Sequence, residues 1–169
     1  MGQYSAKEKA KAGLFGALLQ IRDEQRAAQK NARVVIAGES LPWETNPFAI
    51  MQWYLHPAIK DTVTRQYIVS VIKIPPGSRS GILRTPGDSV IYVWQGQGHS
   101  VIIDKSYTWE TADVVQLPAR PYGINVQHFN DDKNNPVLLI WCQPNLIDAS
   151  GVDNGTEFDV LEPCPEFKD

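Results

Sequence analysis

The stretch Gly77–Gly96, GSRSGILRTPGDSVIYVWQG, decides the fold. It follows Pro75-Pro76 directly, and these prolines end a run of β-branched and apolar residues over 67–74. It closes with the strand-forming run 90–94 and Gly96. Proline removes a ladder hydrogen bond and glycine permits positive φ, so both ends of the stretch are predicted to be turns. The stretch therefore predicts strands joined by tight turns.

Similar short runs of strand-forming residues continue through the middle of the chain. They cover 67–74, 90–94, 100–103, 107–109, 114–117, 123–129 and 137–141. Regularly spaced short strands separated by glycine and proline are typical of a β-sandwich or a small barrel. No helical segments alternate with these runs, so a parallel α/β sheet is excluded. The sequence predicts a mainly β fold.

Three further segments flank this β region. Residues 5–31 predict an amphipathic helix, an element that often serves oligomerisation when it is appended to a β-domain. Residues 34–57 predict an extended arm, because Pro42 and Pro47 forbid a continuous helix. The expected organisation is one domain with appendages: helix and arm in 1–62, β-domain in 63–145, and an acidic tail in 146–169.

The arm and the tail both carry large apolar side chains that need to be buried. We expect the arm aromatics to pack on the outside of the chain's own β-domain or against another subunit. The apolar residues of the tail indicate that part of it docks on the β-domain or on a partner. The side chains concerned are Trp43, Phe48, Trp53 and Tyr54 in the arm, and Phe158 and Phe167 in the tail.

Composition limits the classes of partner. The 169 residues carry a formal net charge of −3, with 21% charged and 43% hydrophobic residues. This balance favours neither nucleic acid nor an anionic membrane as a partner. The first residues lack an apolar run of signal-peptide length, and no stretch is long enough to span a bilayer. We therefore expect a cytoplasmic protein.

The frame of Gly77–Gly96 resembles the first motif of the cupin superfamily. That motif has a glycine, a His-x-His pair, a Glu four residues later and a closing glycine. The segment Trp109–Pro118 resembles the second motif, which ends at Gln127–Asn130. The resemblance covers under half of the chain. It implies a cupin-type antiparallel jelly-roll barrel.

The metal ligands of the cupin motifs are missing from this chain. The three slots of the first motif hold Leu83, Thr85 and Ser89. The fourth slot holds Val126 when the second motif is aligned on Asn130, or Gly123 when it is aligned on Pro118. None of these side chains supplies an imidazole or a carboxylate to a transition metal. We expect this chain to bind no metal and no other cofactor.

His128 is the remaining candidate for chemistry. Strand alternation places it on the same face as Val126, where it could reach the cavity. With Tyr122 or Tyr92 it could act as an acid–base pair in a stand-alone isomerase or lyase. The alternative is a hydrogen-bonded structural histidine near the barrel rim.

In size, degenerate motifs and the arm sequence, the chain is similar to the small subunit of the two-component hydroquinone 1,2-dioxygenases. That family implies a heterotetramer in which a larger cupin subunit holds Fe(II) and cleaves hydroquinone to 4-hydroxymuconic semialdehyde. It also implies that the arm and tail side chains named above contact the larger subunit. Two alternatives remain open: the stand-alone enzyme using His128, and a non-catalytic homodimer that binds a small molecule.

Overall fold

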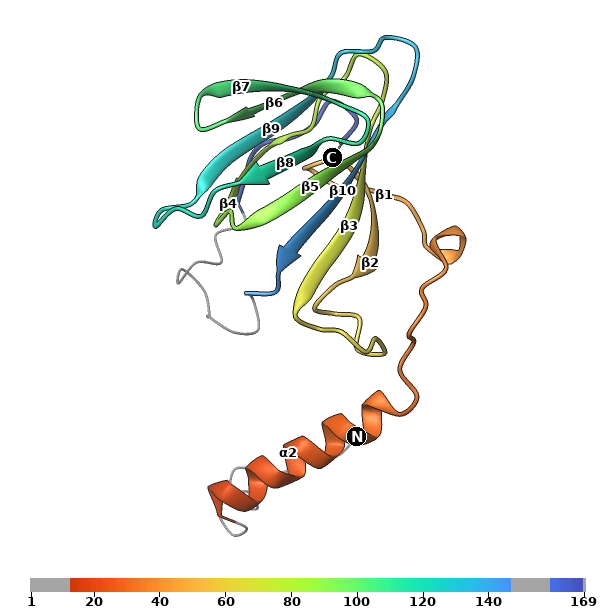
Figure 1. Ribbon diagram of the computed structural model, residues 1–169, viewed down its shortest axis with the longest axis vertical. Helices are drawn as coiled ribbons and strands as arrows, with labels where there is room; N and C mark the ends of the chain where they lie inside the picture. Colours follow the sequence, from red (N-terminus) through yellow and green to blue (C-terminus); the bar gives the residue numbers. More distant parts are fainter. Residues whose placement is uncertain (1–12, 147–158, 169) are drawn as a thin grey trace. The chain divides into compact units, whose positions relative to one another are not determined.

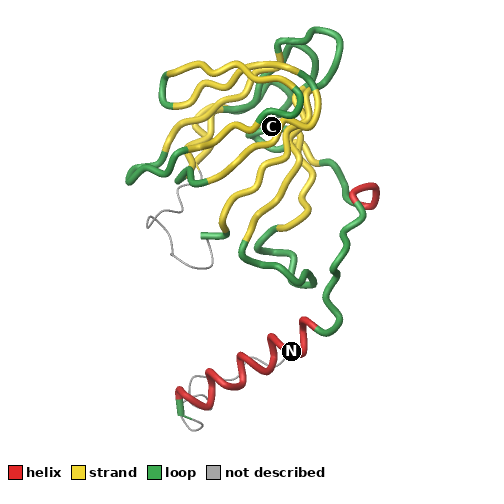
Figure 2. Tube along the Cα trace, in the orientation of Figure 1, coloured by secondary structure: helices red, strands yellow, loops and turns green. Residues whose placement is uncertain are grey.

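The computed structural model describes residues 13–146 and 159–168, and these residues form two antiparallel β-sheets (Figure 1). The six-stranded sheet has the order β1 (Glu44–Thr45), β2 (Ile50–Leu55), β3 (Tyr67–Ile74), β10 (Val137–Pro144), β5 (Ser89–Gln95), β8 (Val114–Leu117). The five-stranded sheet has the order β11 (Asp159–Glu162), β4 (Ile82–Thr85), β9 (Ile124–Asn130), β6 (Gln97–Ile102), β7 (Lys105–Glu110). Figure 2 shows these strands joined by turns and, between β2 and β3, by a longer loop over residues 56–66.

The core lies between the inward faces of the two sheets. Buried and less buried residues alternate along β5, β9 and β10, so every second side chain points inward. Ile72, Val93, Leu139 and Trp141 are among the fully buried side chains. The alternation that predicts strands in the sequence thus also builds the core.

By its contacts the chain divides into two compact units, one of residues 1–35 and 60–63, the other of residues 36–59 and 64–169. In the first unit, helix α2 (Leu14–Gln29) begins after Gly13, and Leu14, Phe15 and Leu18 on it are exposed. The same unit has a parallel bridge between Arg33 and Thr62, with Arg33 paired to Asp61 at 2.9 Å. Within the described ranges, no helix combines the length and the apolarity that a bilayer crossing requires.

The predicted arm is not a separate extension, because β2 is a full member of the six-stranded sheet. It pairs antiparallel with β3, and Met51 is buried in the core. On the outer side of β2, the Gln52 side chain donates hydrogen bonds to the carbonyls of Gly38 and Leu41, each at 2.8 Å. The β-domain therefore starts N-terminal to residue 63.

The tail docks on the β-domain through backbone pairing, one of the two possibilities the sequence left open. Strand β11 pairs with β4, and Glu162 accepts a 2.7 Å hydrogen bond from Arg79. Further on, the Cys164 N–H donates to the Pro47 carbonyl at 2.8 Å. The end of the chain thus supplies the outer strand of the five-stranded sheet.

Gly96 and Gly98 are required for different reasons. Gly96 has φ 97°, a conformation that L side chains rarely adopt. Gly98 has ordinary φ, but a Cβ there would overlap the backbone carbonyl oxygen of Phe129 and crowd the ring of Trp109. Gly98 therefore allows β6 to lie close to β9.

We expect Gly98→Ala to lower the free energy of unfolding by about 2 kcal/mol, because the added methyl has to displace backbone rather than a flexible side chain. Ser106→Ala, on the exposed neighbouring strand β7, is the control and should stay within about 0.5 kcal/mol of the parent. Urea unfolding followed by far-UV circular dichroism measures both. An unchanged Gly98→Ala protein would contradict the close approach of β6 to β9.

Candidate functional site

The four positions that correspond to cupin metal ligands lie in the interior between the sheets. Leu83 and Thr85 on β4, Ser89 on β5 and Val126 on β9 are all buried. Leu83 and Val126 are direct partners in the β4–β9 register. Gly123 lies in the turn before β9 with φ 69°. Val126 thus lies on the inner face of β9 opposite Leu83, whereas Gly123 lies outside the strand.

The side chains at these positions do not fit a transition metal. Leu83 and Val126 have no donor atom, and the Ser89 hydroxyl accepts a 3.0 Å hydrogen bond from the Trp141 indole N–H. Neutral hydroxyls are poor ligands beside the imidazole and carboxylate that Fe, Mn and Zn prefer. Among the residues that the structure describes, no three His, Cys, Asp or Glu side chains gather elsewhere. The donor chemistry of the cupin centre is thus replaced by apolar and hydroxyl groups.

His128 faces the interior together with Val126, as the strand alternation predicts, and it is 1% exposed. Its Nδ1 lies 2.7 Å from the Ser100 hydroxyl, which also accepts a 2.8 Å hydrogen bond from the Trp109 indole N–H. Because that hydroxyl accepts from Trp109, its own proton is free to donate to Nδ1. The Ser100 oxygen has two lone pairs, so either the Ser100 hydroxyl or an Nδ1–H of His128 can donate in this bond.

Burial lowers the pKa of His128 from its ordinary value of 6.5 to about 4, since the interior disfavours the charged imidazolium. The ring is therefore neutral at pH 7. Its Nε2 is buried, and within the described part of the chain it has no hydrogen-bond partner. The sequence left two roles open for His128, an acid–base residue or a hydrogen-bonded structural histidine. The buried, neutral ring fits the structural role.

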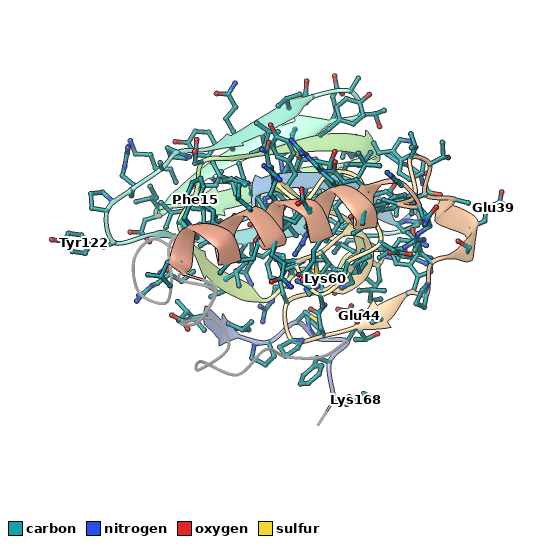
Figure 3. All side chains as sticks on the ribbon, turned by 90° about the horizontal axis from the view of Figure 1, so that it is seen from below. Phe15, Glu39, Glu44, Lys60, Tyr122 and Lys168 are labelled. Atoms are coloured by element: carbon teal, nitrogen blue, oxygen red, sulfur yellow. The ribbon has the colours of Figure 1, made fainter. Side chains whose placement is uncertain are left out.

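The tyrosines considered as partners of His128 lie elsewhere. Tyr122 is 88% exposed in the turn between β8 and β9, and Figure 3 shows it pointing away from the sheets. Tyr92 faces outward on β5 and is half-exposed. The structure therefore does not bring either phenol to the imidazole.

The residues expected to contact a partner differ in how far they are exposed. Phe48 is buried in the core, with its ring 5.9 Å from that of Trp141 and 6.2 Å from that of His128, so its assignment to a partner interface was wrong. Trp53 is partly buried and donates to Glu44 at 2.7 Å. Trp43 is exposed, with the Lys73 ammonium over its ring, and Tyr54 is partly buried against Gly38. Phe167 is partly buried, and Phe158 lies outside the described residues.

A different apolar surface was missed by the sequence analysis. It is the outer face of β5, β8 and β10, formed by Val90, Tyr92, Trp94, Val114, Leu138 and Ile140, which we call the outer-face patch. Tyr92 lies opposite both Ile140 and Val114 in the strand registers. The signal was present in the run 90–94, where both alternating sets of side chains are apolar.

A cavity of about 1010 Å³ opens where β7 and β8, each the last strand of its sheet, face one another. Its inward-facing lining includes Ser89, Ile102, Trp109, Leu117 and Gln143. Leu83, Thr85 and Val126 do not line it. The cavity therefore lies beside these positions and shares only Ser89 with them.

Comparison with solved structures identifies the class of fold. The chain is similar to a cupin-like protein from Thermotoga maritima (TM-score 0.53, 15% identity, covering 78% of this chain and 90% of that one). It is also similar to a protein with a double-stranded β-helix domain from Klebsiella pneumoniae (TM-score 0.54, 12% identity, covering 76% and 96%). The predicted cupin-type jelly roll is thereby confirmed.

A third similar structure is the polyketide cyclase RemF from Streptomyces resistomycificus (TM-score 0.54, 9% identity, covering 66% and 79%). A scan against models of protein families finds no match for this chain, and a search of curated proteins finds none either. Identities this low are evidence for the fold alone. The function has to be argued from the residues.

The neutral, buried His128 makes stability depend on pH. Its pKa falls on folding, so the unfolded chain binds the proton between about pH 6.5 and 4, and the stability present above pH 6.5 is lost as the pH falls through this window. We expect the contribution of His128 to the free energy of unfolding to drop by about 2 kcal/mol between pH 7.5 and pH 5. Urea titrations at the two pH values measure it.

His128→Gln should remove this component, because glutamine keeps a hydrogen-bond acceptor for Ser100 but does not titrate. His99→Gln is the matched control; His99 is only partly buried, beside Asp131, and its replacement should leave the His128 component in place. Equal pH dependence in the parent and His128→Gln would show that folding does not lower the pKa of His128.

Proposed function

We propose that this chain is the metal-free small subunit of a two-component, Fe(II)-dependent dioxygenase that cleaves hydroquinone to 4-hydroxymuconic semialdehyde. In this proposal a larger cupin subunit holds the iron, and the chain stabilises that subunit in a heterotetramer. The observation that carries the proposal is that all four ligand positions of the jelly roll are buried and hold Leu83, Thr85, Ser89 and Val126. In this proposal these four side chains fill the interior of the β-domain and bind no metal, so the chain does not catalyse metal chemistry by itself.

The outer-face patch supports the need for a partner. Tyr92, Trp94 and Val114 are 41%, 51% and 54% exposed, and the outward-facing positions of β5, β8 and β10 include no charged residue. With its neighbours the patch presents on the order of 400 Å² of apolar surface, within the range of patches that mark interaction sites. A stable interface buries about 800 Å² per partner, so the patch would form the centre of a larger contact.

The larger cupin subunit is the occupant that this surface favours. An uncharged face is matched by another apolar face, and permanent hetero-complexes use interfaces of this kind. The arm residues, which the family resemblance assigns to the interface, are partly engaged within the chain through Glu44, Lys73 and Gly38. The outer-face patch is therefore the stronger candidate for the centre of the contact.

The stand-alone isomerase or lyase is less well supported. It needs a titratable His128 near a phenol, whereas this histidine is buried and neutral at pH 7 and both tyrosines point elsewhere. A general acid or base works best when its pKa lies near the operating pH. This reading predicts turnover by the chain alone, and the proposed function predicts none.

We expect the chain, affinity-tagged in its native host, to retain a larger cupin subunit in constant ratio. Trp94→Asp should abolish this retention, because the change places a charge at the centre of an apolar contact. Tyr122→Asp is the matched control, because it adds the same charge on an exposed loop away from the patch, and it should retain the partner. A parent chain that elutes as a stable homodimer without a larger subunit would refute the proposed partner.

Metal content provides a separate check. We expect the purified chain alone to contain far less than one transition metal per chain and to show no ring cleavage. The complex should contain iron in proportion to the larger subunit and cleave hydroquinone with uptake of O₂. Elemental analysis and oxygen consumption measure the two quantities. One tightly bound metal per isolated chain would overturn the claim that its ligand positions are non-functional.

A further inference from the structure

The floor of the cavity between β7 and β8 carries a polar side chain that makes no hydrogen bond within the described part of the chain. Gln143 on β10 is 6% exposed and lines the cavity. Within residues 13–146 and 159–168, its amide has no hydrogen-bond partner. The Gln143 amide is not among the fully buried polar atoms that lack a partner, so it is accessible from the cavity and can form hydrogen bonds with a molecule bound there.

Ser89 adds a second polar group to the same lining. It is 6% exposed, and its oxygen accepts from Trp141 at 3.0 Å, which leaves its hydroxyl proton free to donate. The floor thus offers an amide carbonyl that accepts, an amide nitrogen that donates and a hydroxyl that donates. A ligand hydroxyl, which both donates and accepts, matches this set.

The walls are aromatic and apolar. Tyr67 at the start of β3, Tyr107 and Trp109 on β7, and Ile102 and Leu117 line the cavity. The Trp109 indole N–H already donates to Ser100, so this side chain offers a ligand the face of its ring and no hydrogen bond. Aromatic walls of this kind favour a planar ring over a flexible chain.

Charge is confined to the rim. Lys105 and Arg120 line the cavity as exposed residues, and so do Asp88 and Asp113, so that the two signs balance. The two polar floor groups, Gln143 and Ser89, are neutral. A carboxylate placed at the floor would therefore be buried without a counter-charge, which is costly, whereas a neutral hydroxyl would not.

We propose that this cavity binds an uncharged aromatic compound that carries a hydroxyl group, with the hydroxyl on Gln143 and Ser89 and the ring between Tyr107 and Trp109. The volume of about 1010 Å³ accommodates a compound of one or two rings together with water. The site lies wholly within residues 67–144 of this chain. It therefore does not depend on the larger subunit of the proposed function.

The test is isothermal titration of the full-length chain with 2-naphthol and with 2-naphthoate, which differ in the polar group. We expect saturable binding of 2-naphthol below about 1 mM and at least roughly tenfold weaker binding of 2-naphthoate. Gln143→Leu should weaken 2-naphthol at least about fivefold. Gln95→Leu is the matched control, since Gln95 lies outside the cavity lining, and it should bind like the parent.

Tyr107→Ser provides a second variant, because Tyr107 is half-exposed on the outermost strand β7 and its loss does not open the core. It should weaken 2-naphthol about threefold or more through loss of stacking. Equal or tighter binding of 2-naphthoate would overturn the ligand class. Unchanged binding in a folded Gln143→Leu and in Tyr107→Ser would overturn the site. Absence of saturable binding by the parent would overturn the proposal altogether.

Discussion

The burial of Trp141 between the two sheets is the constraint on which the rest of the interior depends. Its ring packs against Phe48, and its indole N–H needs an acceptor, which Ser89 supplies. Ser89 occupies the position that is a metal-binding glutamate in the cupin motif. A carboxylate there, without a metal, would be a buried and unpaired charge. The hydroxyl at position 89 therefore satisfies the Trp141 indole and keeps this part of the core uncharged.

The sequence predicted the strands well because their signal is local, as in the alternation of β5, β9 and β10. It also predicted the inward direction of His128. It did not identify β2 as a member of the sheet, since Pro42 and Pro47 suggested an arm and only pairing with the distant β3 makes residues 50–55 a strand of the sheet. Phe48 and the outer-face patch were misjudged for the same reason, because burial depends on which segments meet in space.

The two candidate surfaces of the β-domain serve different purposes. The outer-face patch is apolar and uncharged, and it suits a large, permanent contact. The cavity between β7 and β8 combines aromatic walls with an accessible amide, and it suits a small molecule. Both involve the outermost strand β8 and its neighbour β5, and Val90 and Val114 of the outer-face patch also line the cavity. The same strands therefore form both surfaces, and a molecule bound at one contacts strands that also form the other.

The pairing of β11 with β4 has a consequence for synthesis of the chain on the ribosome. Strand β4 emerges early, but its two neighbours are β9 and β11, which are both made later. Until residues 159–162 have been added, one backbone edge of β4 has no partner strand, and open edges of this kind promote pairing between chains. Pairing of β11 with β4 is therefore the contact that completes the five-stranded sheet and covers this edge.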